Sequence, residues 1–320
     1  MRAPAAELVL EGTPTKGFLR LTLLLSLATF FLIGLGGLVN STGSGLSVPD
    51  WPTTYGRHLF LYPLSEWKGG ILYEHSHRLV AAMVGFLAFA AVLWSWLGIT
   101  HPRYRWLRWG AAVAFLLVVI QGILGGLTVL LRLPTAISVS HAMLAQSFFA
   151  VTLLLALGAR PGWYEAPVVG SLAVLERASR VTTIVWGMTF VQILAGALTR
   201  HTYSALAIPD FPLVFGGLFP SVLNDQVLVH YVHRVLGFAL AAAVVWQATV
   251  LWQLPPMRGW VLSSLGLVLL QILLGGWIVW SFRAVGPTTL HVIGGTALWA
   301  VQCVMAFQLW RWRKLQTHRS

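Results

Sequence analysis

Residues 74–78 read Glu-His-Ser-His-Arg, and residues 230–234 read His-Tyr-Val-His-Arg. Each segment opens a long run of apolar residues and places a His-Arg pair about one helical turn inside it. Two further histidines, His141 and His291, open two more apolar runs in matching places. Single histidines at one depth of four apolar helices predict a membrane bundle that contains a repeated site.

The composition is that of a membrane protein. Of the 320 residues, 57% are hydrophobic and 9% are charged, whereas a soluble domain has about 25% charged residues. Apolar runs of about 20 residues, the length that crosses a bilayer as a helix, occur at 17–39, 71–98, 106–131, 137–158, 179–199, 228–252, 259–281 and 288–311. The predicted fold class is therefore an all-α polytopic membrane protein with eight transmembrane helices.

Positive charges predict the orientation, because Lys and Arg concentrate in cytoplasmic segments. With the N-terminus inside, fourteen Lys and Arg residues lie in inner segments and five in outer loops. Both termini are therefore expected on the cytoplasmic side of the plasma membrane. The formal net charge of +12 serves this topology and contact with anionic lipid, so nucleic acid is not an expected partner.

The second half of the chain repeats the first. Three pairs of segments match in the same order: 36–52 with 196–212, 77–78 with 233–234, and 121–141 with 271–291. An even number of spans in each half makes the repeats parallel, related by an axis along the membrane normal. We therefore expect two pseudo-twofold-related four-helix bundles, one formed by residues 1–160 and one by residues 161–320.

The first connection of each half is long, about 40–70 and 200–227, and carries a Pro-Asp-aromatic-Pro turn. Proline restricts its own backbone and that of the preceding residue, so these outer loops are expected to fold back as caps over the bundle mouth.

The glycine pairs at 36–37, 125–126 and 275–276 have two interpretations. They allow close helix packing, or they leave room for a flat macrocycle against the backbone.

The four histidines are the candidate ligands. His77, His141, His233 and His291 all open helices that start at the outer face, so they lie at similar depth. Ionisable residues inside a membrane are costly and mark function. A single histidine could merely bond a neighbouring carbonyl, but four in a repeat favour two haems, each bound by two imidazoles from facing helices.

The residues around the histidines bear on the alternatives. Arg78 and Arg234 lie where haem propionates would reach, and a guanidinium pairs with a carboxylate bidentately. Zinc is less favoured, because no nearby Cys or Asp completes a tetrahedral set. An electron-transfer wire across the bilayer would need histidines at both depths of the same helices.

The two halves differ three residues before the ligand histidine, where Glu74 stands in the first half and His230 in the second. Residues three apart share a helix face, so Glu74 lies on the same face as its histidine. A carboxylate at a haem edge suits proton delivery, although it could instead cap the helix N-terminus. We hypothesise that the first half is catalytic and that the second holds a permanent haem.

Together these motifs resemble the haem A synthase family over nearly the whole chain. The resemblance rests on Glu-x-x-His-Arg at 74–78, Thr-Gly-Ser-Gly-Leu-Ser and Pro-Asp-Trp-Pro within 42–52, Gln-Gly-Ile-Leu-Gly-Gly at 121–126, and the histidines that open the fourth, sixth and eighth helices. It implies an enzyme that oxidises the C8 methyl group of haem O to a formyl group by successive hydroxylations. The product, haem A, serves terminal oxidases.

The resemblance also implies roles for single residues. His77 and His141 would flank the substrate haem, with Glu74 as the catalytic carboxylate beside it, while His233 and His291 would ligate a haem b cofactor. A haem O synthase and an electron donor would be the protein partners. Two histidines on the substrate iron leave no open position for oxygen, so either one ligand dissociates or the oxidising equivalents reach the methyl group by another route.

The chain departs from the family in its first outer loop. Many bacterial members carry a cysteine pair there, whereas this chain has Val48 and Thr54, so a thiol role in that loop is not expected.

Two other functions would also use the four histidines as haem ligands. A dihaem b-type electron-transfer cytochrome would have no need for Glu74 to break the repeat, and a haem transporter would bind haem reversibly.

Overall fold

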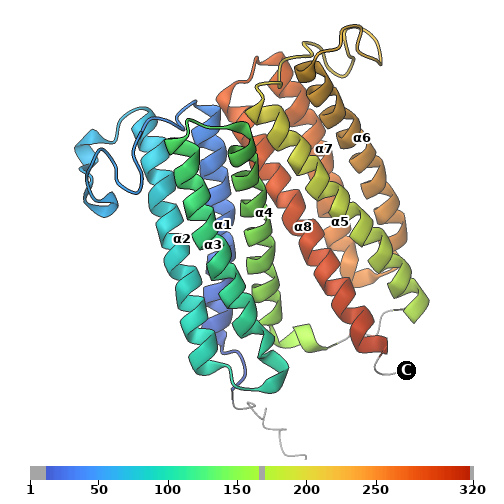
Figure 1. The fold of residues 1–320 in the computed structure, drawn as a ribbon. Helices are drawn as coiled ribbons and strands as arrows, with labels where there is room; N and C mark the ends of the chain where they lie inside the picture. Colours follow the sequence, from blue (N-terminus) through green and yellow to red (C-terminus); the bar gives the residue numbers. More distant parts are fainter. Residues whose placement is uncertain (1–11, 166–169, 318–320) are drawn as a thin grey trace, which may run out of the picture.

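The computed structural model describes residues 12–165 and 170–317, and in these ranges it contains eight helices long and apolar enough to cross a membrane (Figure 1). They are α1 (Lys16–Ser41), α2 (Gly70–Gly98), α3 (Trp106–Leu130), α4 (Thr135–Gly158), α5 (Leu172–His201), α6 (Asp225–Leu251), α7 (Arg258–Trp280) and α8 (Val285–Thr317). The predicted all-α, eight-span fold of a multi-pass membrane protein is confirmed. The chain termini themselves lie outside the described residues.

Two helices are longer than their apolar spans predict. α5 begins at Leu172, where Ser171 Oγ accepts a hydrogen bond from the Val174 amide at 3.4 Å. α8 continues to Thr317. Backbone hydrogen bonding continues a helix through polar residues that end a hydropathy window, so both helices extend beyond the apolar runs of the sequence.

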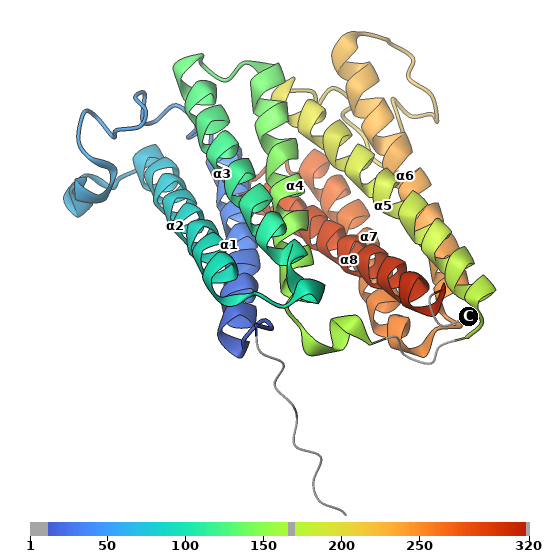
Figure 2. The same ribbon diagram turned by 60° about the horizontal axis from the view of Figure 1, so that its bottom comes forward.

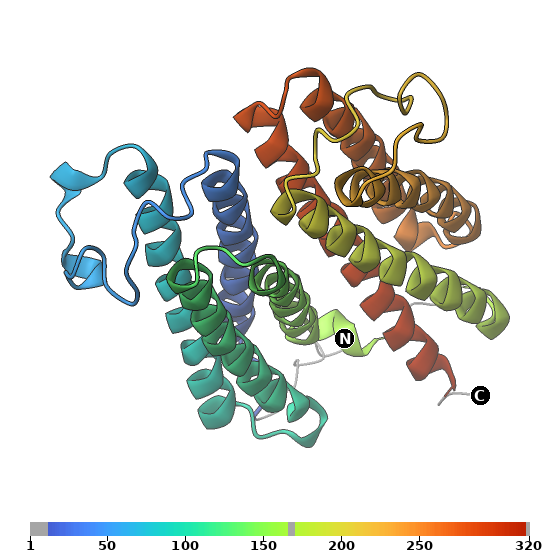
Figure 3. The ribbon, with the colours of Figure 1, turned by 45° about the horizontal axis from the view of Figure 1, so that its top comes forward.

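The helices form two groups of four, α1–α4 and α5–α8, which stand side by side (Figures 1 and 3). Within each group the first helix packs on the second, the second on the third, the third on the fourth and the fourth on the first. Contacts of α1 with α8, α4 with α5 and α4 with α8 join the groups. The twofold relation between the groups, and the domain boundary at residue 160, stay predictions.

The junction of the two groups is buried and partly polar. Gln146 Nε2 on α4 donates to Thr296 Oγ1 on α8 at 3.1 Å, a pair separated by 150 residues. Trp299 is fully buried, donates its indole N–H to the Gln146 carbonyl at 3.0 Å, and stacks on Trp186 with ring centroids 5.5 Å apart. Cys303 lies beside them and accepts the Trp186 indole N–H at 3.2 Å. The paired indoles therefore bind α8 to both α4 and α5.

The two long outer loops lie at the same end of the molecule, where α1 and α5 end (Figure 2). Both contain the same turn. The Asp50 carboxylate accepts the amides of Tyr55 and Gly56 at 2.8 Å each, and Asp210 accepts the corresponding amides of the second loop, also at 2.8 Å. The repeat seen in the sequence thus extends to the hydrogen bonds of these loops.

Each loop rests an aromatic ring on a glycine of the third helix of its group. A Cβ atom at Gly126 would lie 2.5 Å from the Trp51 ring, and one at Gly276 would lie 2.7 Å from the Phe211 ring. Any larger residue on α3 or α7 would therefore push the ring away. Each loop therefore folds back far enough to reach the third helix of its group, and the prediction that the loops cap the bundle mouth stays a prediction.

Candidate functional site

The four candidate ligand histidines each lie beside a glycine of a neighbouring helix. The pairs are Gly36 of α1 with His77 of α2, Gly125 of α3 with His141 of α4, Gly196 of α5 with His233 of α6, and Gly275 of α7 with His291 of α8. A Cβ atom on these glycines would lie 3.1, 3.1, 3.2 and 3.7 Å, respectively, from the Cε1 atom of the histidine. The glycines therefore make room for imidazole rings. Neither close helix packing nor space for a macrocycle, the two interpretations of the glycine pairs, included this role.

The histidines lie together in the predicted pairs. The rings of His233 and His291 have centroids 6.3 Å apart and are inclined by 76°. A metal binds an imidazole nitrogen at about 2 Å, so one iron fits between two rings at this separation. His77 and His141 are likewise close enough to interact electrostatically. Each group of helices thus offers two imidazoles, and this donor set fits a haem iron.

Glutamine side chains from neighbouring helices contact three of the four histidines. Gln121 Nε2 donates to the His141 carbonyl at 2.9 Å. Gln192 Nε2 donates to the His233 carbonyl at 3.1 Å and lies 3.2 Å from its Nδ1. Gln271, with its amide oriented so that both ends are satisfied, donates to the His291 carbonyl at 2.9 Å and lies 3.3 Å from its Nδ1.

The two groups differ in what faces the Nδ1 atoms. His233 and His291 each have a glutamine amide there. The buried Nδ1 atoms of His77 and His141 have no side-chain partner among the described residues, and these two rings lie against the backbone of Leu32 and Gln121. Leu32 occupies on α1 the place that Gln192 has on α5, 160 residues later. The amide is therefore missing at His77, because its position carries an apolar residue.

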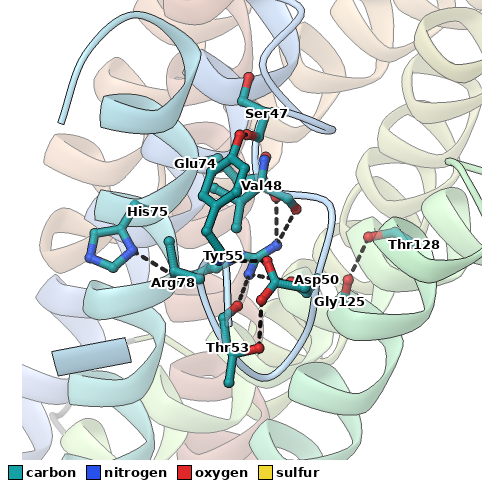
Figure 4. Close-up of polar contacts among 11 residues, drawn as sticks. Ser47, Val48, Asp50, Thr53, Tyr55, Glu74, His75, Arg78, Gly125 and Thr128 are labelled. Atoms are coloured by element: carbon teal, nitrogen blue, oxygen red, sulfur yellow. Dashed lines mark hydrogen bonds and ion pairs between the residues drawn. The ribbon is translucent and has the colours of Figure 1, made fainter. Parts of the chain in front are cut away.

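Glu74 is buried, with 4% of its surface exposed, and both of its oxygens have partners (Figure 4). Its Oε1 accepts from Arg78 Nη2 at 2.7 Å, and its Oε2 accepts from the backbone amide of Val48 at 2.8 Å. The carboxylate thus caps the outer loop rather than the N-terminus of its own helix. It still lies three residues before His77, on the helix that carries this histidine.

Arg78 holds the same loop through carbonyl oxygens. It donates to the carbonyls of Val48 at 2.8 Å, Asp50 at 2.7 Å and Thr53 at 2.9 Å (Figure 4). Its two terminal nitrogens thereby make four hydrogen bonds, including the ion pair with Glu74. A contact of this guanidinium with a haem propionate stays a prediction.

His230 and Arg234 reproduce this arrangement in the second loop. Arg234 donates to the carbonyls of Asp210 at 2.7 Å, Leu213 at 3.0 Å and Ile208 at 3.1 Å. Its Nε lies 3.1 Å from His230 Nε2, and the Ile208 amide lies 3.3 Å from His230 Nδ1. A neutral imidazole has one acceptor nitrogen. His230 therefore accepts a hydrogen bond from only one of the two N–H groups that face it, whereas Glu74 accepts both with its two oxygens.

The structure adds functional neighbours that sequence reasoning missed. His75 is fully buried, pairs with Thr54 through Nδ1 at 3.0 Å, and lies against the rings of Tyr62 and Trp67. It anchors the first outer loop on α2. Gln192 was also missed, although the matched glutamines at 121 and 271 mark the same kind of position.

The chain is similar to known proteins over most of its length. The family model COX15-CtaA, cytochrome oxidase assembly protein, matches residues 19–303. A protein of Shouchella clausii named "Heme A synthase" is 32% identical over 72% of this chain and 76% of its own length. Proteins with the same name from Alkalihalophilus pseudofirmus and Geobacillus kaustophilus are each 30% identical; they cover 84% and 80% of this chain and 89% and 80% of their own lengths.

Proposed function

The chain belongs to the COX15-CtaA family of cytochrome oxidase assembly proteins, and on that premise we propose that it oxidises the C8 methyl group of haem O to a formyl group by successive hydroxylations. It is an enzyme of haem A synthesis, since relatives that match most of the chain are named for that activity. Haem O is then the substrate and haem A the product.

We propose that His77 and His141 flank the substrate haem and that His233 and His291 ligate a haem b cofactor. The glycine seats under all four rings support the placement, as does the centroid separation of 6.3 Å in the second pair. A bound haem b supplies one-electron redox chemistry that no amino-acid side chain here provides. The lack of a glutamine amide at the Nδ1 atoms of the first pair suits a site that must exchange its haem.

One observation carries the assignment of the catalytic half: the carboxylate Glu74 is replaced by His230 in otherwise matching hydrogen-bond arrangements. The α1–α4 group alone therefore has a buried acid on the helix that carries a ligand histidine. We propose that Glu74 delivers a proton from a carboxyl oxygen to the haem edge while Arg78 keeps that carboxyl group in place. Arg78 and Arg234 hold the loops that border the two sites, which is where propionates would approach.

The proposed location is the plasma membrane, with both termini in the cytoplasm and both sites near the outer face. The charge bias supports this orientation, because fourteen Lys and Arg residues lie in inner segments against five in outer loops. A haem O synthase that delivers the substrate and an electron donor are the expected protein partners.

The test is to express the chain in a host that makes haem O but not haem A, and to separate the extracted haems by chromatography. We expect haem A with the wild-type chain and none with Glu74→Gln, whose haem spectrum should persist. The matched variant His230→Gln should still yield haem A. Full activity of Glu74→Gln would contradict the role of the carboxylate. Unmodified haem O with the wild-type chain, in a host with a working reductant, would favour an electron-transfer cytochrome or a transporter.

A further inference from the structure

Arg200, at the outer end of α5, has a buried cationic nitrogen without a partner. Its Nη2 atom is inaccessible to solvent and makes no hydrogen bond to any described residue. The ion pairs among the described residues are Arg57–Glu66 and Arg78–Glu74, so no carboxylate of that part of the chain neutralises Arg200. An unpaired buried charge is costly, and the position therefore calls for an anion that the protein does not supply.

The surroundings of Arg200 add a second cation. Arg283, in the turn between α7 and α8, is near enough to interact electrostatically with Arg200. Two guanidinium groups, neither of them paired with an acid among the described residues, favour a carboxylate.

The position of Arg200 relates this cluster to the second histidine pair. Arg200 follows Gly196 by four residues, so it lies one turn further out on the helix face that seats His233. It also interacts electrostatically with His291. A group bound between these two histidines would therefore present its outer edge to Arg200.

The matching positions of the first half carry no arginine. At the repeat spacings of 160 and 150 residues, Asn40 stands in place of Arg200 and Leu133 in place of Arg283. The backbone is nevertheless the same, since Leu133 has φ 61° and Arg283 has φ 65°. The turn of the first half has its own arginine one residue earlier, Arg132, so the two sites differ in where their cations stand, and above all in the presence of Arg200.

We infer that Arg200, with Arg283 near it, binds a propionate group of the haem in the α5–α8 group. This inference rests on the proposed haem between His233 and His291. The first site, where Asn40 replaces Arg200, lets the substrate haem enter and leave, whereas Arg200 helps the second site to retain its haem.

The test measures how fast haem leaves the purified full-length chain, loaded with haem b, for an excess of apomyoglobin. We expect Arg200→Gln to accelerate the slow phase roughly tenfold or more, as for the loss of a charged hydrogen bond. Arg200→Lys should have a smaller effect, and Asn40→Ala should leave the slow phase unchanged. If Arg200→Gln folds poorly, Arg283→Gln should show the same change to a lesser degree.

A second arm uses haem b with both propionates esterified, which no longer carries a negative charge. We expect wild type and Arg200→Gln to release the ester at the same rate. The inference would be overturned if wild type and Arg200→Gln released native haem at the same rate. It would also be overturned if Arg200→Gln accelerated the release of native haem and of the ester equally, a result expected if Arg200 bound a lipid phosphate instead. A His233→Ala chain that retained all its haem would instead overturn the proposed haem site, whatever Arg200 does.

Discussion

Replacement of Gln192 by leucine is expected to loosen the haem proposed for the α5–α8 group. Gln192 Nε2 lies 3.2 Å from His233 Nδ1, and its Oε1 is buried without a partner. The same Nε2 donates to the His233 carbonyl at 3.1 Å, so the amide holds this histidine at its ring and at its backbone. Such a contact fixes the orientation of the imidazole proposed to bind iron.

The magnitude follows from the role of such partners. Removing the hydrogen-bond partner of a metal-ligating histidine costs roughly 10- to 100-fold in metal affinity, which corresponds to about 1.4–2.7 kcal/mol. Leucine is close to glutamine in size and already stands at the matching position, residue 32. The Gln192→Leu chain should therefore keep its fold while its haem becomes easier to remove.

The assay is the haem content per chain after repeated detergent washing, together with the optical spectrum of the haem that remains. The reciprocal variant Leu32→Gln should retain haem in the α1–α4 group longer and slow the release of product. A Gln192→Leu chain with wild-type haem retention and an unchanged spectrum would refute the reasoning.

Three further predictions concern the outer loops. Arg78→Gln should lower the free energy of unfolding by about 3–5 kcal/mol, because it leaves a buried carboxylate without its cation; Arg234→Gln should cost less, since its partner is an imidazole that can be neutral. Equal losses of stability for the Arg78→Gln and Arg234→Gln variants, measured by thermal unfolding, would contradict this difference. Gly126→Ala should cost about 1–3 kcal/mol by overpacking against the loop indole, and faster hydrogen exchange in that loop alone would verify the site of damage. The Gly216 amide donates to Asp210 and holds the pKa of that carboxyl below 3.8, so the turn should be fully stabilised above that pH and lose stability as the pH falls through the lowered pKa; Asp210→Asn should abolish this dependence in hydrogen exchange of the Gly216 amide.

Much of the fold could be predicted from the sequence because its signals are local or repeated. Apolar length defines a spanning helix, and all eight predicted spans correspond to helices. The spacing of the repeat placed His77 with His141 and His233 with His291. Proline-rich composition was enough to predict that the outer loops fold back, although not which glycines receive them.

The partners of the charged groups could not be predicted, because they depend on tertiary packing. Arg78 donates to loop carbonyls from Val48 to Thr53, and no sequence pattern records backbone acceptors. Arg200 was counted only as an outer-loop charge. The burial of its Nη2 atom depends on tertiary packing, which hydropathy does not report.

The contact between Gln146 and Thr296 has a consequence for how the two sites came to differ. Two identical chains paired about a twofold axis place each axial residue against its own copy, so every change in one site is made in the other as well. Here the residues that meet are 150 positions apart in one polypeptide and are already different, an amide donor and a hydroxyl acceptor. A single covalent chain can thus keep Glu74 on one side of this junction and Arg200 on the other, a difference that a symmetric dimer of four-helix chains could not encode.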